Sequence, residues 1–330
     1  MRPWGGLADL VLLARPRQWT KNAVCFAALV FAGRLTDPAA VGPAVLTFVG
    51  FCLASSAIYV LNDLFDRAED RAHPVKRRRP LAAGRIAVGP ALIEMALLAA
   101  GAIVVSSFLV PRARAVLAAY LLVNLAYSTA LKRVAILDVM IIALGFVLRV
   151  EAGIEAIRAP QSAWIILTMF FMALFLGFAK RRGELGLHSD PAARAHRGVL
   201  GAYSVAFLDI LLAVSATTAL VCYALYAVTV QTNETFLVTV LPVVFGILRY
   251  MMLVLVRERH EDPDELLTRD GPLVLAMLVW AAVSIAVLYL DLRLFPGAAL
   301  QPQRRVREER GRPSLARPEG RPGTSRSPEK

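Results

Sequence analysis

Four oxygen-bearing side chains stand together directly after an apolar run over residues 41–61 of this 330-residue chain. Asn62, Asp66 and Asp70 are four residues apart, and Asp63 lies three before Asp66. On a helix, this spacing places the four side chains, here called the Asn–Asp stripe, on one face. Carboxylates packed so closely repel one another unless a cation lies among them. Oxygen ligands without His or Cys favour a hard cation, so the stripe predicts a Mg²⁺ site whose three carboxylates are catalytic.

A basic run follows the stripe and comprises Lys76, Arg77, Arg78 and Arg79. Mg²⁺ is commonly bound together with substrate phosphates, which Lys and Arg also bind. Stripe and run together predict a site for Mg²⁺ and a diphosphate at the mouth of a membrane helix, with Asn62, Lys76 and Arg77 contacting substrate. The alternative is a solvated loop in which Asp and Arg pair with each other, since cytoplasmic loops are basic in any case.

The composition indicates a polytopic membrane protein. The chain is 57% hydrophobic, its mean hydropathy is +0.58, and its apolar residues come in blocks too long for a soluble core. No cleavable signal peptide is expected, because basic residues precede the first apolar run and no small-residue cleavage site follows it. We predict an all-α bundle of nine transmembrane helices, over residues 20–34, 41–61, 88–109, 114–131, 135–157, 161–180, 204–229, 235–256 and 272–291.

Charge predicts the orientation of the bundle. With the N-terminus in the cytoplasm, the cytoplasmic segments carry 21 Lys and Arg residues and the opposite loops carry four. Residues 1–300 are predicted to form the catalytic domain and residues 301–330 a disordered basic tail. Nine spans place this tail outside, in conflict with its eight Arg and one Lys. The net charge of +12 fits basic loops and phosphorylated substrates, and no nucleic-acid partner is expected.

Further polar residues gather at the predicted cytoplasmic side. Lys21 begins the first span, and Tyr127, Lys132 and Asp138 flank the turn between the fourth and fifth spans. All four are candidate substrate-binding residues, with phosphate oxygens as partners of the first three. Asp138 would meet a ribose hydroxyl or orient a cation. The alternatives are an interfacial anchor for Lys21, and loop charges with a helix cap for the other three.

Four other candidates are charged residues in or at the end of the fifth and sixth spans. Arg149 lies inside the fifth span, where an unpaired charge costs about 3 kcal/mol, so it should face the bundle interior and an anion. A buried ion pair with Glu151 or Glu155 is the alternative. The sixth span ends in Lys180, Arg181 and Glu184, which are candidate substrate-binding residues or a charged helix end that only marks topology.

Taken together, these motifs resemble the UbiA-type intramembrane prenyltransferase superfamily. N-D-x-x-D-x-x-x-D after the second span carries this resemblance. R-P-R-Q-W-T-K-N, Y-S-T-A-L-K, G-F-V-L-R-V-E-A-G and A-K-R-R-G-E-L are similar to its decaprenyl-phosphate phosphoribosyltransferase branch. The resemblance runs from about Arg15 to Leu290. Other superfamily members carry a second Asp-rich motif where this chain has Lys180 to Glu184, and this departure favours the phosphoribosyl branch.

The resemblance implies a reaction, a cofactor and a location. A polyprenyl (decaprenyl) phosphate would attack C1 of 5-phosphoribosyl 1-diphosphate with Mg²⁺ and release diphosphate, giving a precursor of cell-wall arabinose donors. The protein would lie in the plasma (inner) membrane with its active site facing the cytoplasm. One alternative is transfer of an isoprenoid diphosphate to an aromatic acceptor, and another is an anion transporter. The sequence leaves both a monomer and a homo-oligomer open.

Overall fold

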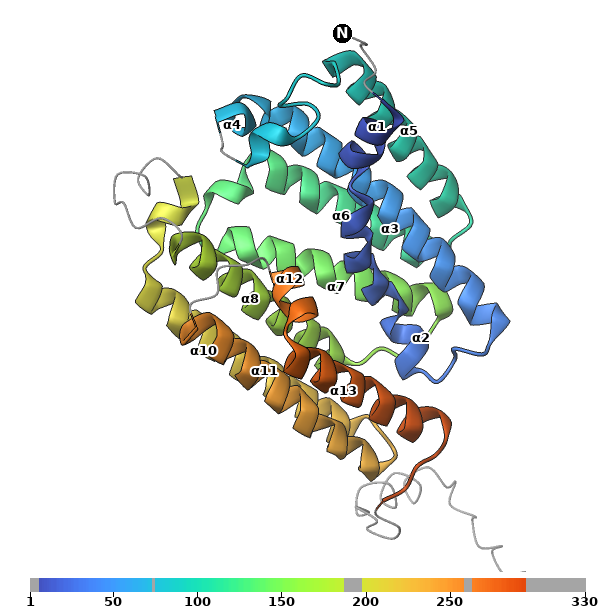
Figure 1. Ribbon diagram of the computed structural model, residues 1–330. Helices are drawn as coiled ribbons and strands as arrows, with labels where there is room; N and C mark the ends of the chain where they lie inside the picture. The colour runs from blue at the N-terminus through green and yellow to red at the C-terminus, as the bar shows by residue number, and fades with distance from the viewer. Residues whose placement is uncertain (1–5, 73–74, 187–197, 258–262, 295–330) are drawn as a thin grey trace, which may run out of the picture. The chain divides into compact units, whose positions relative to one another are not determined.

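The computed structural model describes residues 6–72, 75–186, 198–257 and 263–294. The chain divides into two compact units, Met1–Arg293 and Leu294–Lys330, and every described helix belongs to the first. The predicted tail over residues 301–330 lies outside the described residues. Within them the regular elements are all α- or 3₁₀-helices, as predicted (Figure 1).

The helices follow one another through short connections, and 3₁₀-helices are labelled η. In chain order they are α1 (Leu7–Ala14), η1 (Pro16–Phe26), α2 (Ala27–Phe31), α3 (Pro38–Phe65), α4 (Arg67–Ala72), η2 (Lys76–Arg78), α5 (Val88–Ser107), α6 (Pro111–Thr129), η3 (Leu131–Arg133), α7 (Leu137–Ile157), α8 (Ala163–Gly186), η4 (Gly198–Ala202), α10 (Val205–Thr229), η5 (Glu234–Thr239), α11 (Val240–Leu255), α12 (Pro263–Arg269) and α13 (Gly271–Tyr289).

Six described helical segments are long and apolar enough to cross a membrane, which supports a multi-pass membrane protein. They match six of the predicted spans and are Pro38–Phe65, Val88–Ser107, Ala163–Gly186, Val205–Thr229, Glu234–Leu255 and Gly271–Tyr289. The predicted fourth and fifth spans are the helices α6 and α7, but these carry more polar residues. α7 alone contains Asp138, Arg149, Glu151 and Glu155. The count of nine spans is therefore not confirmed.

The first predicted span has an unexpected backbone. Residues 20–34 do not form one α-helix, because η1 is a 3₁₀-helix of 11 residues that continues into the five-residue α2. A 3₁₀-helix is thinner and longer per residue than an α-helix, and long runs of it are uncommon. η1 also lies very close to its neighbour α7: a Cβ added to Gly153 would overlap the backbone carbonyl oxygen of Cys25. Glycine therefore permits the η1 backbone to lie directly against α7.

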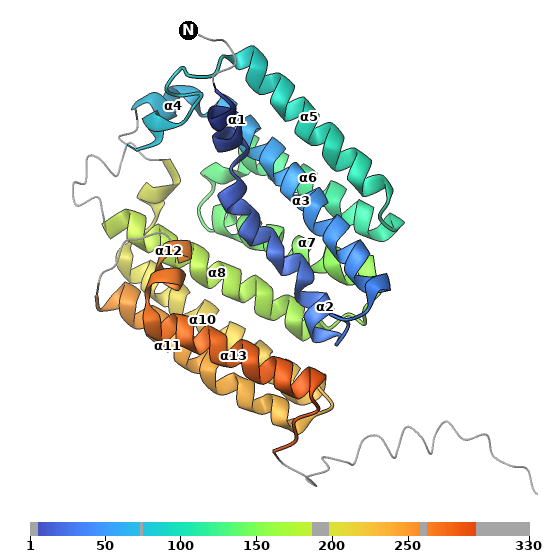
Figure 2. The same ribbon diagram turned by 45° about the vertical axis from the view of Figure 1, so that its right-hand side comes forward.

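α7 lies at the centre of the packing. Its residues Val139 and Ala143 belong to a hydrophobic core shared with α8, α10, α11 and α13. Further along the same helix, Val150 and Ile154 pack in a second core with residues of α2, α3 and α6. On either side of α7, α3 lies beside α5 and α8 lies beside α10 (Figures 1 and 2). Because α7 joins both cores, the position of its first turn is fixed relative to both sets of helices.

Candidate active site

The Asn–Asp stripe runs across a break between two helices. α3 ends at Phe65, Asp66 has φ −89° and ψ 6°, and α4 begins at Arg67. The backbone N–H groups of Asp66 and Asp70 still donate to the carbonyls four residues earlier, each at 2.8 Å. The stripe therefore keeps the predicted helical spacing, although two helices carry it.

Asp63 is the buried centre of the stripe. Its side chain is 2% exposed and accepts hydrogen bonds from Arg15 and, at 3.0 Å, from Nη1 of Arg79. The same nitrogen donates to Asp70 at 2.6 Å. Because one nitrogen contacts both carboxylates, their oxygens lie no further apart than the sum of these two distances. The structure thus brings Asp63 and Asp70 together, as the stripe predicts.

Arg15 reaches Asp63 from a strained backbone conformation. It is the single residue between α1 and η1, with φ 53° and ψ 57° in the left-handed region. A residue with a side chain pays about 1–2 kcal/mol to adopt this conformation. The guanidinium also lies over the ring of Tyr59, 5.2 Å from its centroid. Local sequence gives no sign of this turn, which directs Arg15 of the N-terminal segment at the end of α3.

Asp66 forms an ion pair with a lysine from another part of the chain. Nζ of Lys132, in η3, donates to Asp66 at 2.6 Å, and the two side chains are 25% and 30% exposed. This ion pair joins the turn after α6 to the end of α3. Asn62 makes no comparable contact: its Oδ1 atom is buried and has no hydrogen-bond partner among the described residues.

The predicted four-ligand magnesium site is not assembled in this conformation. Within the described residues, no three His, Cys, Asp or Glu side chains are grouped so that they could hold a metal ion. Arginine and lysine side chains form ion pairs with the three carboxylates instead. The residue types nevertheless fit Mg²⁺, since Asp63 and Asp70 converge on one atom and Asn62, next to Asp63 in the chain, has a buried oxygen without a partner among the described residues.

A second ionic cluster joins the first turn of α7 to the last turns of α8. Asp138 is completely buried and accepts a hydrogen bond from Nε of Arg181 at 2.8 Å. Nη1 of Arg181 also donates to Glu184 at 2.7 Å, and Tyr127 of α6 lies beside Arg181. The sequence predicted all four as substrate-binding residues, and the structure brings these four together.

Tyr203 completes this second cluster, and no sequence pattern predicted it. Its hydroxyl donates to Asp138 at 2.8 Å and accepts from the backbone N–H of Ile136, a residue with φ 70°. Burial raises the pKa of Tyr203 to about 12, so the hydroxyl remains a donor at neutral pH. Tyr203 follows η4, far from Asp138 in sequence, and no local motif marks it.

Arg149 lies in a buried polar network that includes no acidic partner from the described part of the chain. Its side chain donates from Nε to Asn22 at 2.7 Å and from Nη2 to the Tyr120 hydroxyl at 2.9 Å. The guanidinium also lies over the ring of Tyr120, 4.8 Å from its centroid. The ion pairs considered for Arg149 are not formed, since Glu151 accepts from Gln161 and Glu155 pairs with Arg112. The alternative of a buried ion pair is therefore wrong.

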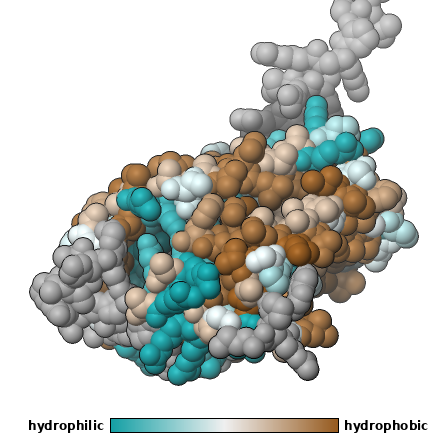
Figure 3. Space-filling view, turned by 90° about the horizontal axis from the view of Figure 1, so that it is seen from above, coloured by the Kyte–Doolittle hydropathy of each residue, from teal (hydrophilic) through white to brown (hydrophobic). Residues whose placement is uncertain are grey.

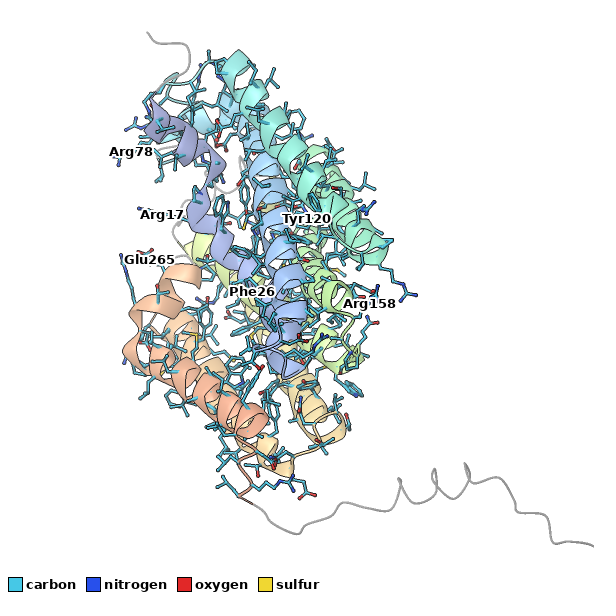
Figure 4. The ribbon with its side chains drawn as sticks, turned by 90° about the vertical axis from the view of Figure 1, so that its right-hand side faces the viewer. Arg17, Phe26, Arg78, Tyr120, Arg158 and Glu265 are labelled. Carbon is cyan, nitrogen blue, oxygen red and sulfur yellow. The ribbon has the colours of Figure 1, made fainter. Side chains whose placement is uncertain are left out.

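The other predicted substrate-binding residues are close in the chain to residues of these clusters. Lys21 is half-buried on η1, Lys76 and Arg77 are exposed on η2, and Lys180 is exposed next to Arg181. Charged side chains occupy opposite sides of the bundle in Figure 4, with Arg17, Arg78 and Glu265 along one side and Arg158 on the other. Viewed from the N-terminal end, hydrophilic side chains gather next to a broad hydrophobic surface (Figure 3).

Comparison with known proteins identifies relatives over most of the chain. The sequence is 36% identical over 300 residues to decaprenyl-phosphate phosphoribosyltransferase of Mycolicibacterium smegmatis, an alignment that covers 86% of this chain and 94% of that protein. The proteins of the same name from Mycobacterium tuberculosis and Corynebacterium glutamicum are 34% and 32% identical, and this chain covers 95% and 90% of their lengths.

Solved structures share the fold at lower sequence identity. A UbiA homolog from Archaeoglobus fulgidus bound to GPP and Mg²⁺ superposes with a TM-score of 0.67 at 21% identity, over 85% of this chain and 99% of that one. The sequence profile of the UbiA prenyltransferase family matches residues 23–269, which contain the stripe and the whole second cluster. This chain belongs to the UbiA prenyltransferase family.

Proposed function

We propose that this protein transfers the 5-phosphoribosyl group of 5-phosphoribosyl 1-diphosphate to decaprenyl phosphate or a similar polyprenyl phosphate. Relatives named for this activity match nearly the whole bundle. The observation that carries the proposal is the cluster at the end of α8. There Arg181 is ion-paired to Asp138 and Glu184. The family resemblance would place a second acidic, metal-binding motif at this point in a prenyl-diphosphate enzyme.

The proposed reaction is a substitution at C1 of the ribose. A phosphate oxygen of the lipid forms a bond to C1, the bond from C1 to the diphosphate breaks, and the diphosphate leaves with the electron pair. The attacking oxygen is already anionic at neutral pH, so no general base is needed. Catalysis then depends on holding two anions in position and stabilising charge on the leaving group.

The stripe and its bases form the proposed leaving-group site. Asn62, Asp63, Asp66 and Asp70 would hold Mg²⁺, which supplies electrostatic stabilisation of the departing diphosphate. Lys132 of η3 is positioned to bind a diphosphate oxygen, because its ammonium group already lies at the stripe and is one-quarter exposed. The nearby Lys76 and Arg77 add exposed positive charge in η2.

The second cluster is proposed to bind the phosphoribosyl half of the donor. Asp138 is fully buried and already accepts hydrogen bonds from Arg181 and Tyr203, so its role here is to orient Arg181. Lys180 precedes Arg181 in the last turns of α8 and is exposed, which suits a contact with the 5-phosphate. The turn from Lys132 to Asp138 connects this cluster with the stripe, and the proposal requires one donor molecule to contact both.

Arg149 is proposed to attract the phosphate of the lipid substrate toward the bundle interior. It is 6% exposed and has no carboxylate partner among the described residues. A buried cation of this kind is stabilised by an anion. We further propose that the polar end of the bundle faces the cytoplasm, where 21 of the Lys and Arg residues then lie.

The test is a two-substrate assay with the purified protein in detergent or lipid. Labelled 5-phosphoribosyl 1-diphosphate, decaprenyl phosphate and Mg²⁺ should yield a labelled lipid and an equal amount of diphosphate. Either substrate alone should give neither product. Turnover of an isoprenoid diphosphate with an aromatic acceptor, together with none of the phosphoribosyl donor, would refute the proposal.

A further inference from the structure

Two arginine side chains occupy the positions on the Asn–Asp stripe that a divalent cation needs. Nη1 of Arg79 contacts carboxylate oxygens of both Asp63 and Asp70, and Arg15 contacts the same oxygen of Asp63. These two carboxylates are almost completely buried, with 2% and 4% of their side chains exposed. Two buried anions this close need positive charge between them, and in this conformation the guanidinium groups provide it.

A cation bound to these oxygens and a guanidinium on the same oxygens exclude each other. Mg²⁺ binds oxygen at about 2.1 Å, closer than Arg79 lies now. If the cation and a guanidinium bound the same oxygens together, two positive charges would also be in contact inside a poorly solvated site. When the carboxylates bind a cation, Arg15 and Arg79 must therefore leave them and find another anion.

The surroundings of Arg79 permit such a movement of the side chain alone. Its side chain is 28% exposed, so neighbouring residues do not enclose it completely. The loop after Arg79 is anchored independently, since Nε of Arg71 donates to the carbonyl of Ala82 and Arg85 pairs with Asp9 at 2.7 Å. The guanidinium can rotate off the carboxylates while this loop stays in place.

We propose that Arg79, assisted by Arg15, exchanges between two anions: the carboxylates of Asp63 and Asp70 in the metal-free protein, and the diphosphate of the donor in the loaded protein. The exchange couples the two ligands. A divalent cation alone must displace the arginines into solvent, whereas a cation with diphosphate gives them a new partner. Metal and diphosphate therefore bind synergistically, and each raises the affinity for the other by the same factor. This inference rests on the proposed function, because it assigns the diphosphate to this site.

The test measures Mn²⁺ binding by electron paramagnetic resonance, with and without inorganic diphosphate. In the unmodified protein, diphosphate should tighten Mn²⁺ binding by about tenfold or more, beyond the binding of Mn²⁺ to diphosphate in solution. In Arg79→Gln, Mn²⁺ alone should bind about tenfold more tightly, and the enhancement by diphosphate should fall below about threefold. Arg15→Gln should change both values in the same direction.

Arg112→Gln is the control, because Arg112 is 84% exposed and contacts Glu155 and no carboxylate of the stripe among the described residues. It should bind Mn²⁺ and diphosphate like the unmodified protein. The inference is overturned if Arg79→Gln binds Mn²⁺ alone no more tightly than this control. If Arg79→Gln does not fold, the same comparison is made with Arg15→Gln. Synergistic binding without phosphoribosyl transfer would refute the proposed reaction only. Transfer with equal Mn²⁺ affinity in the presence and absence of diphosphate would refute this inference only.

Discussion

The ion pair between Arg181 and Asp138 permits a quantitative prediction. Asp138 is completely buried, and in Arg181→Met it would keep only the hydroxyl of Tyr203 and no positive charge. Removing one partner of a buried pair destabilises proteins by about 3–5 kcal/mol. Because the side chain of Arg181 is 19% exposed, we expect the lower end, about 3 kcal/mol.

Removal of both charges should be less harmful than the single changes suggest. In Asp138→Asn combined with Arg181→Met, no unpaired charge is buried, and the amide oxygen can still accept from Tyr203. The double variant should therefore be more stable than the sum of the two single effects, by about 1–3 kcal/mol. Activity should not return, because Arg181 is proposed to contact the donor. All three variants should lose about 100-fold or more in turnover.

Stability can be measured by unfolding in mixed micelles with increasing denaturing detergent, followed by circular dichroism. Arg269→Met is a control, because Arg269 forms an exposed pair with Glu265 and should change the free energy of unfolding by less than about 1 kcal/mol. Additivity of Asp138→Asn and Arg181→Met within about 0.3 kcal/mol would refute the reasoning.

Three further changes test other parts of the account. Gly153→Ala should destabilise the bundle by about 1–3 kcal/mol, because the added methyl group would overlap the carbonyl of Cys25. Gly246→Ala is the control, because the Cβ position of Gly246 is open and no loss of stability is expected. Thermal unfolding compares the two variants, and equal stability would contradict the close approach of η1 to α7. Lys180→Ala should raise the KM for the phosphoribosyl donor about tenfold with a smaller change in kcat, as steady-state kinetics would show; an unchanged KM would return Lys180 to a role in topology. Tyr203→Phe should destabilise the protein by about 1–3 kcal/mol and raise the same KM, since Asp138 then loses a hydrogen bond; an unaltered KM with lower stability would make Tyr203 purely structural.

Patterns within one segment could be predicted from the sequence. Apolar run length and helical spacing predicted the helices and the convergence of Asp63 with Asp70, because both depend only on local geometry. Asp138 and Arg181 were each candidates because of their positions at the ends of predicted spans, but their ion pair was not predicted. The family resemblance predicted the fold and the activity of the relatives.

Contacts between distant segments could not be predicted. Arg15 meets Asp63 because of a left-handed residue after α1, and Arg79 meets it because the loop after α4 folds back. Tyr203 approaches Asp138 from the residue after η4, and no local pattern links it to α7. The backbone of η1 was also unpredictable, since composition does not mark a 3₁₀-helix and its close approach to Gly153 joins segments far apart in the sequence.

The most direct test of the central claim is metal dependence of phosphoribosyl transfer in the unmodified protein and in Asp63→Ala and Asp66→Ala. The unmodified protein should form the phosphoribosyl lipid with Mg²⁺, stop in excess EDTA, and recover when Mg²⁺ is restored. Both variants should insert into the membrane and show no transfer at any Mg²⁺ concentration. Transfer that continues unchanged in excess EDTA, or full activity in both variants, would contradict the role assigned to the Asn–Asp stripe.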